Sequence, residues 1–495
     1  MPTRSTLLGL LLAAAAVVIA AVAVVGDDEG GPVSGETPAG RKPMIFDPGP
    51  LGFDPSIRES TFDEIAALGA DTVRLAFIWQ GVSPDIRPAG FDPTDPSSEG
   101  YDFVEPDNLV RQLKERGLRI LITLIGPFPK WASSSGRSNF ADPDPEKFGQ
   151  FAQAVATRYS GRFDPGEGDP LPAADLWSIW NEPNLSIFLK PQFRGGEPYS
   201  PLLYRRLFVA AADAIHSQIP KARVLAGETA PTGSTDSVDP VAFARGVLCL
   251  DEPVSSSEDC GEPLDAAGWA MHPYATGTTV TPFDSPNNPG FVTIGVLSRL
   301  ESVLDEAAVA GEVRPRLPIE ITEFGIQSEP DPLLGVSLSE QAEYLSIAER
   351  IAYANPRVIS FGQYLLVDDP PDRVPGVQYG GFESGLRSSD GREKPSYPGF
   401  RTPLVVQRQG GQVAIWGLVR PARGETEVEI RARDGGGSPQ SLLSLDTDSA
   451  GIFTARSTYA PDRRWQVVWE NPEGETLNGP WIRSYAFRLP PDAAP

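Results

Sequence analysis

Short apolar runs and longer amphipathic segments alternate along most of the chain. Apolar residues recur with helical spacing in the segment 204–215, at i, i+3, i+4, i+7, i+8 and i+11, which predicts a helix with one apolar stripe. The short runs, rich in β-branched residues, predict eight strands: Met44–Phe46, Thr72–Ile78, Leu118–Ile125, Leu176–Trp180, Val224–Ala226, Ala267–Met271, Leu317–Thr322 and Val358–Leu366.

Strands that are apolar on both faces, each followed by an amphipathic helix, predict a parallel sheet covered by helices. Eight such units over about 350 residues favour an α/β fold of the (β/α)₈ barrel type with inserted loops, over residues 43–402. A doubly wound open sheet shares this alternation, but no glycine-rich turn follows the first predicted strand, so the barrel is favoured.

The pattern changes at about Pro403, after which short alternating segments follow one another without helical periodicity. Residues 403–495 are therefore predicted to form a small all-β sandwich. Its tryptophans either stack on sugars at the surface or fill the core, and the core is favoured because aromatic residues dominate such cores. These tryptophans are Trp416, Trp465, Trp469 and Trp481.

The N-terminus carries a nearly unbroken apolar run at Leu7–Val25, with Arg4 before it and acidic residues after it. Residues 1–26 are expected to be a cleaved signal peptide or a retained membrane anchor, and residues 27–42 a polar linker. Both alternatives place the rest of the chain outside the cell, either secreted or held at the outer face of the cytoplasmic membrane.

The charge balance narrows the class of partner. A formal net charge of −24 argues against nucleic acid as a partner, because phosphate binding needs clustered Lys and Arg. Two cysteines, Cys249 and Cys260, lie 11 positions apart, and in an exported chain a disulfide between them is favoured over two free thiols. Two histidines are too few for a histidine-rich metal site, and no cofactor is expected.

Two glutamates stand where predicted strands end. Glu182 lies in the sequence Trp180-Asn181-Glu182-Pro183 after the fourth predicted strand, and Glu323 follows Thr322 at the end of the seventh. Barrel enzymes place their chemistry at the carboxyl ends of the strands, so both carboxylates are expected at one rim. A carboxyl pair of this kind is what glycoside hydrolysis requires.

With these motifs the chain resembles the clan of retaining (β/α)₈ glycoside hydrolases that includes the cellulase-like family five and the xylosidase-like family thirty-nine. The resemblance covers about residues 43–400 and rests on Asn181-Glu182-Pro183 and on Glu323. It is supported by Arg74, by His272-Pro273-Tyr274 and by the stretch 385–395. It implies a carbohydrate substrate with a β-glycosidic bond, cut by double displacement.

The resemblance also implies a role for individual residues. Glu182 would be the acid/base, Glu323 the nucleophile, and Asn181 the partner of the sugar 2-hydroxyl. Arg74 and Tyr274 would orient the nucleophile and keep it charged.

Further positions are expected to line the substrate. His272 would lie beside the scissile bond, although it could equally be a histidine of the core. Arg74 could instead be a buried ion-pair partner in the barrel. Trp131 is the favoured sugar platform after the third strand. The tryptophan common at the end of strand eight is missing, and Tyr364 or Gln363 is expected in its place.

Other functions fit the sequence less well than glycoside hydrolysis. A non-catalytic glycan-binding barrel would be expected to have lost a carboxylate, and a metal-dependent barrel hydrolase would need a His-x-His pair at the first strand. An adhesion protein built on the sandwich would leave the barrel motifs unexplained.

Glu320 should point away from Glu323, toward the helices, because side chains alternate along a strand.

Overall fold

The computed structural model describes residues 40–136, 139–166, 168–251, 260–275, 281–422 and 424–489. The predicted signal peptide or anchor at 1–26 lies outside the described residues, as does nearly all of the linker. None of the helices in the described ranges is both long enough and apolar enough to cross a membrane.

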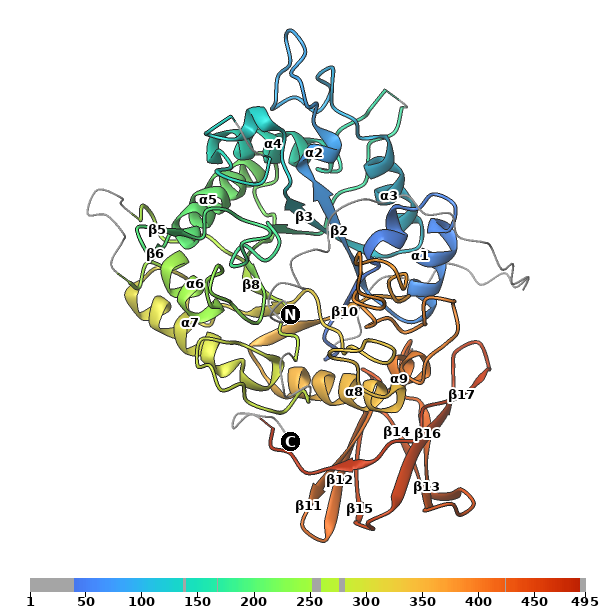
Figure 1. Ribbon diagram of the computed structural model, residues 1–495. Helices are drawn as coiled ribbons and strands as arrows, with labels where there is room; N and C mark the ends of the chain where they lie inside the picture. The colour runs from blue at the N-terminus through green and yellow to red at the C-terminus, as the bar shows by residue number, and fades with distance from the viewer. Residues whose placement is uncertain are drawn as a thin grey trace.

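The first part of the chain is a closed barrel of eight parallel strands, which confirms the (β/α)₈ prediction (Figure 1). Neighbouring strands around the barrel follow the order β1-β10-β9-β8-β7-β4-β3-β2. The strands are β1 (Met44–Asp47), β2 (Thr72–Ile78), β3 (Arg119–Ile125), β4 (Leu176–Ile179), β7 (Val224–Thr229), β8 (Gly268–Met271), β9 (Ile319–Ile321) and β10 (Val358–Tyr364).

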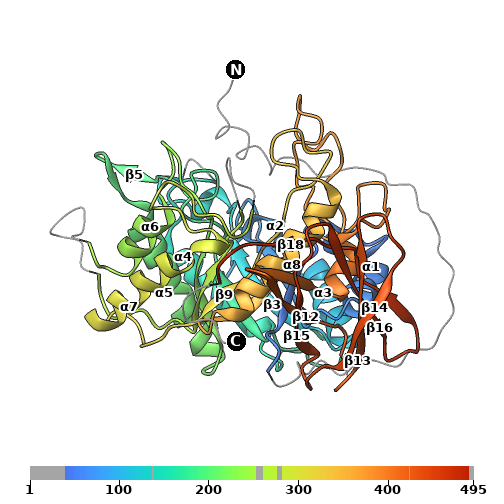
Figure 2. The ribbon, with the colours of Figure 1, turned by 90° about the horizontal axis from the view of Figure 1, so that it is seen from below.

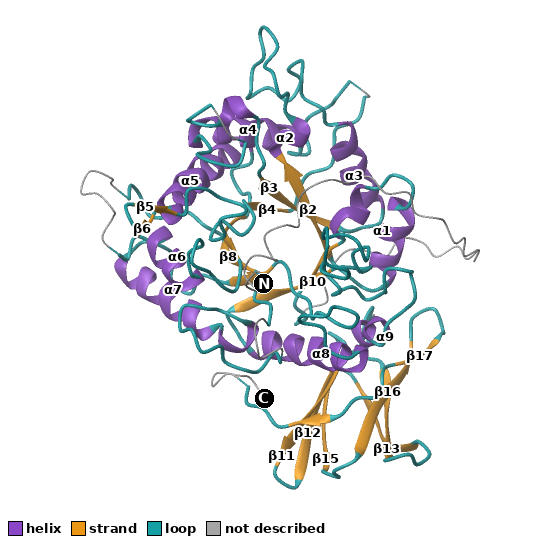
Figure 3. Ribbon diagram, in the orientation of Figure 1, coloured by secondary structure: helices purple, strands orange, loops and turns teal. Residues whose placement is uncertain are grey.

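Helices surround the strands in a ring (Figure 3). The stripe predicted within 204–215 lies on α5 and is buried, as the helical spacing requires. The helices are α1 (Arg58–Ala67), α2 (Trp79–Val82), α3 (Val104–Glu115), α4 (Pro145–Arg158), α5 (Ser200–Gln218), α6 (Pro240–Val247), α7 (Ser298–Ala310), α8 (Leu338–Ala354) and α9 (Ser396–Arg401). Along the chain, a two-stranded ribbon of β5 (Phe193–Arg194) and β6 (Glu197–Pro198) comes between β4 and α5.

Apolar side chains from the strands fill the inside of the barrel. One buried cluster joins β1, β3, β4, β7 and β8 through Ile45, Leu121, Leu176, Leu225 and Ala270. A much larger buried cluster lies between the strands and the helices. Because the barrel is packed rather than hollow, polar chemistry has room only at its rim.

The C-terminal part is an all-β sandwich of two four-stranded sheets, as the sequence predicted. Their strand orders are β15-β12-β11-β18 and β14-β13-β16-β17. The strands are β11 (Leu404–Gln409), β12 (Gln412–Leu418), β13 (Glu427–Asp434), β14 (Gln440–Asp446), β15 (Ile452–Thr458), β16 (Arg463–Glu470), β17 (Thr476–Asn478) and β18 (Ser484–Tyr485).

The sandwich tryptophans are mainly structural. Trp465 and Trp469 are buried in the sandwich core, which confirms the favoured alternative for them. Trp416 is buried against the barrel, with its ring 5.5 Å from that of Tyr353. Trp481 is partly exposed, and the guanidinium of Arg433 stacks 4.4 Å from its ring.

The sandwich lies alongside α8, as Figures 1 and 2 both show. Two ion pairs cross the contact: Arg420 pairs with Glu349 at 2.5 Å and is buried, and Arg483, which is partly exposed, pairs with the buried Glu343 at 2.5 Å. The predicted disulfide between Cys249 and Cys260 is present after α6, with Cα atoms 6.2 Å apart.

Candidate active site

The backbone after β4 is turned sharply at the carboxyl rim of the barrel. Trp180 has φ +70° and Glu182 has φ +43°, both in the left-handed region that non-glycine residues rarely adopt. The amide of Glu182 donates to the backbone oxygen of Glu228 at 2.8 Å, which ties the turn to the neighbouring strand. Strained residues of this kind cluster at functional sites, and here the strain brings the Glu182 carboxyl to the rim.

Glu323 follows β9, and both of its oxygens are held by donors. Arg74 of β2 donates to Oε1 at 2.5 Å, and the hydroxyl of Tyr274 donates to Oε2 at 3.0 Å. Two donors, one of them a cation, suit an ionised carboxylate that has a fixed orientation.

Arg74 is the cationic centre of the site. It is buried and donates to Asp47 at 2.6 Å as well as to Glu323. Its second terminal nitrogen donates to the Asn181 side-chain oxygen at 2.8 Å and to Glu228 at 3.0 Å. Burial alone would lower the pKa of Arg74, but the surrounding carboxylates raise it well above its usual value. The arginine is therefore both a buried ion-pair partner and a part of the site.

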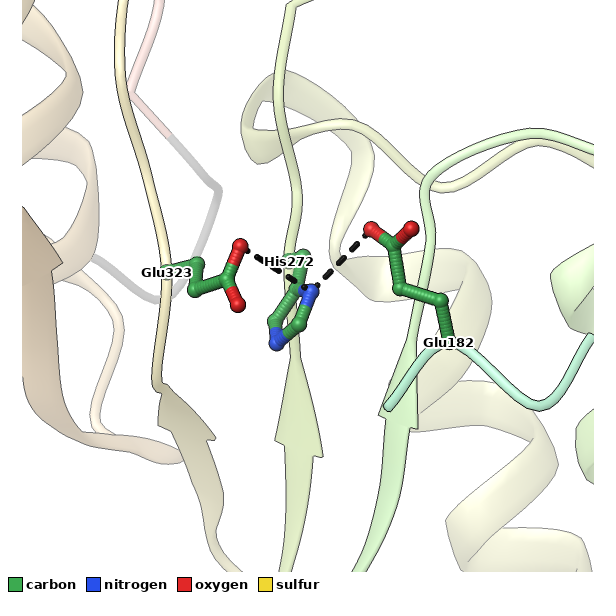
Figure 4. A group of neighbouring side chains, drawn as sticks. All are labelled: Glu182, His272 and Glu323. Atoms are coloured by element: carbon green, nitrogen blue, oxygen red, sulfur yellow. Dashed lines mark hydrogen bonds and ion pairs between the residues drawn. The ribbon is translucent and has the colours of Figure 1, made fainter. Parts of the chain in front are cut away.

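His272 lies between the two glutamates (Figure 4). Its Nδ1 is 3.1 Å from Glu182 Oε1 and 3.5 Å from Glu323 Oε2, and its Nε2 is 2.7 Å from Glu228 Oε2. Burial alone would lower the pKa of His272, but these carboxylates raise it to about 10. At neutral pH the ring therefore carries a proton on both nitrogens.

One oxygen of Glu182, one oxygen of Glu323 and one ring nitrogen of His272 lie within 4.8 Å of one another, a spacing that a metal ion would tolerate. Arg74 already supplies positive charge to Glu323 in this group.

Two further predicted residues stand next to the pair. The side-chain oxygen of Asn181 accepts from Arg74, which leaves its amide hydrogens for another partner. Tyr364, at the end of β10, packs edge-on against Phe382. Burial and then the charge of Glu323 raise the pKa of Tyr364 well above its usual value, which places its ring near that carboxylate.

Other predicted positions have contacts that fill structural roles. Trp131 donates its indole hydrogen to the Pro84 carbonyl at 2.8 Å, and Arg87 stacks 5.2 Å from its ring. Gln363 is buried and donates to backbone carbonyls. Glu320 pairs with Arg223 on the helix side of β9, as strand alternation predicted.

Two acids of the site were missed by sequence reasoning. Asp47 is the last residue of β1, and Glu228 lies near the end of β7. Both lie at the carboxyl end of a barrel strand, which is the position that identified Glu182 and Glu323. Neither is part of a recognisable motif.

No protein-family model and no curated protein sequence matches the chain. Solved structures share its fold. One is a family 39 glycoside hydrolase from the gut symbiont Bacteroides cellulosilyticus WH2, with 17% identity, a TM-score of 0.50, and coverage of 84% of this chain and 81% of that one. Another is a glucosidase from Croceicoccus marinus, with 14% identity, a TM-score of 0.50, and coverage of 88% and 96%. At such identities the likeness is one of fold, and it agrees with the fold expected from the motifs.

Proposed function

We propose that the protein is a retaining glycoside hydrolase, which cleaves β-glycosidic bonds of a polysaccharide or glycoconjugate by double displacement. One observation carries the proposal: oxygens of Glu182 and Glu323 approach within 4.8 Å at the barrel rim. Retaining enzymes hold their carboxyl groups about 5–5.5 Å apart, whereas inverting enzymes need about 6.5–9.5 Å to fit a water between them.

The contacts of the two glutamates differ, and the difference supports distinct roles. Glu323 has both oxygens fixed by Arg74 and Tyr274, which holds its carboxyl group in one orientation, as a nucleophile requires. The carboxyl group of Glu182 contacts only the ring of His272 among these residues, and the Glu182 side chain is 15% exposed. A carboxyl that exchanges protons with a leaving group and then with water needs such access.

The reaction then has two steps. Glu323 attacks the anomeric carbon while the bond to the leaving oxygen breaks and the proton of Glu182 passes to that oxygen. In the second step Glu182 takes a proton from water, whose oxygen attacks the same carbon and releases Glu323. Asn181 lies beside both glutamates and offers its amide hydrogens to the sugar 2-hydroxyl.

The test uses a panel of aryl β-glycosides and β-linked polysaccharides with wild type, Glu182→Ala and Glu323→Ala. Activity on one substrate that is lost in both variants is expected. Azide should rescue the Glu182→Ala variant on activated substrates and give a β-glycosyl azide, whereas rescue of Glu323→Ala should give the α-anomer. Glu320→Gln is the matched control, because Glu320 is on β9, the strand that Glu323 follows, but faces the helices. This variant should stay active.

Two outcomes would overturn the proposal. A folded wild type without activity, but with measurable glycan binding, would favour a non-catalytic glycan-binding barrel. Activity that survives Glu323→Ala would show that the nucleophile is another group.

The proposed site of action is outside the cytoplasm. The apolar run after Arg4 and the disulfide between Cys249 and Cys260 support export, because disulfides persist in oxidising compartments. Cell fractionation with protease treatment of intact cells tests this, and N-terminal sequencing distinguishes a cleaved signal from an anchor. Protein found only in the cytoplasm with reduced cysteines would refute it.

A further inference from the structure

The backbone of β7 is irregular at one point, close to its carboxyl end. Its register with β8 shifts between Gly227 and Thr229, so Glu228 has no paired residue there. Gly227 has φ +102° and Glu228 has φ +51°. A Cβ on Gly227 would come within 2.6 Å of the Ala270 carbonyl oxygen, so only glycine fits. Bulges next to active sites re-aim side chains, and this one turns Glu228 into the barrel.

The carboxylate of Glu228 is completely buried, and three donors bind one of its oxygens. Its Oε2 receives hydrogen bonds from His272 Nε2 at 2.7 Å, from Arg74 at 3.0 Å and from the Thr322 hydroxyl at 3.2 Å. Burial favours the neutral acid, but Arg74 and His272 outweigh it and lower the pKa of Glu228 to about 2. Glu228 is therefore a permanent negative charge beneath the site.

We infer that Glu228 is a positioning residue that holds His272 as an imidazolium, with the Nδ1 proton directed at Glu182 and Glu323. The inference rests on the proposed function for its catalytic meaning. A neutral imidazole has one proton, which the carboxylate of Glu228 would hold at Nε2. The bare Nδ1 lone pair would then face the Glu323 carboxylate at 3.5 Å and repel it.

A fixed cation at this position fits both states of the reaction. In the free enzyme the negative charge of the pair is on Glu323, and in the glycosyl-enzyme it is on Glu182, whose proton has left with the leaving group. His272 Nδ1 lies 3.5 Å from the first and 3.1 Å from the second. The imidazolium can thus pair with whichever carboxylate is charged, without moving. Glu228 touches neither reacting group.

The charged and titratable groups around the His272 ring belong to several strands. Glu182 follows β4, Glu228 is on β7 and Glu323 follows β9. Arg74 of β2 is the cation that shares Glu228 and Glu323 with the ring. Loss of the charge on Glu228 therefore removes the negative charge opposite Nε2 and leaves Arg74 to oppose protonation of the ring.

The first measurement is direct. The chain has two histidines, so ¹⁵N-histidine NMR of the His216→Gln variant shows His272 alone. In the parent protein the ring should stay doubly protonated from pH 6 to pH 9, in line with its pKa of about 10. In Glu228→Gln that pKa should fall by about three pH units or more. Glu320→Gln removes another buried carboxylate and should leave the His272 signals unchanged.

The second measurement is kinetic. With Glu228→Gln, kcat should fall about tenfold or more at pH 8 and recover toward the wild-type value at pH 5.5, where the ring is again protonated, while KM changes little. A purely structural role would not produce this dependence on pH.

Three results would overturn the inference. They are a wild-type ring that is singly protonated at pH 7.5, a variant ring with an unchanged pKa, and a variant pH profile parallel to that of wild type. The NMR result does not depend on activity, so its failure is separable from failure of the glycosidase proposal. The wild-type titration decides the matter even if Glu228→Gln does not fold.

Discussion

Replacement of Glu383 by glutamine should stabilise the protein, and more so as the pH rises. Glu383 lies between β10 and α9, is 1% exposed, and has no hydrogen-bond partner at either side-chain oxygen. Burial and then the nearby charges of Asp331, Asp368 and Asp369 raise its pKa to about 8, although Lys394 acts in the opposite direction. The folded protein therefore keeps this carboxyl protonated where the unfolded chain ionises it.

The size and sign follow from linkage. Between about pH 4.5, where the unfolded carboxyl titrates, and about pH 8, where the folded one does, the native state binds one more proton than the unfolded state. The free energy of unfolding then falls by about 1.4 kcal/mol for each pH unit, to a total of about 5 kcal/mol at pH 8. Solvent that reaches the loop would reduce this total, so about 2–5 kcal/mol is expected. Below pH 4.5 the contribution disappears.

The assay is urea unfolding of wild type and Glu383→Gln at pH 5, 6.5 and 8. The variant should be more stable at pH 8, and its advantage should shrink toward pH 5. Glu343→Gln is the control, because it also removes a buried carboxylate, but one that Arg483 and Tyr485 bind. It should destabilise the protein. A Glu383→Gln advantage that is the same at all three pH values, or a loss of stability at pH 8, would refute the reasoning.

Further predictions concern the site, the disulfide and the sandwich. Asn181→Ala should lower kcat/KM by about 10²–10³ through lost transition-state contact with the 2-hydroxyl, and a 2-deoxy glycoside should show no such difference. Replacement of both Cys249 and Cys260 by serine should cost about 3 kcal/mol in urea unfolding, while a reductant should give the same loss in wild type. Trp416→Ala should cost about 3–5 kcal/mol, because it opens a cavity where the sandwich meets the barrel, and a melting temperature equal to that of wild type would contradict this.

The barrel could be predicted because its strands are buried on both faces and are therefore largely apolar runs. The sandwich was harder to predict. Its edge strand β14 has the sequence QSLLSLD, in which four of the seven residues are exposed, and β17 has three residues. Strands at a sheet edge bury little and so leave a weak pattern in the sequence.

The site was predictable as far as motifs and strand ends reach. Glu182 and Glu323 each belong to a motif and each follow a predicted strand. Tyr274 contacts Glu323, as the resemblance implied. The role of Trp131 as a sugar platform stays a prediction, because its loop has no repeating pattern that fixes which way the indole points.

Glu228 was hidden for a different reason. Leu225 points into the barrel, so strict alternation would turn Gly227 inward and Glu228 outward. The bulge at Gly227 reverses this order, and a bulge is not visible in an apolar pattern.

The charges of the candidate site suit the cationic transition state of the proposed reaction. Four acids meet two cations: Asp47, Glu182, Glu228 and Glu323 surround Arg74 and the His272 imidazolium. With the proton of the acid/base in place on Glu182, the group has one net negative charge, and burial removes the water that would screen it. As the proton leaves Glu182, the anomeric carbon becomes positive before its bond to Glu323 is complete. In the proposed reaction the positive charge on the sugar then offsets the net negative charge of the site. The site is therefore better matched to the transition state than to the neutral substrate.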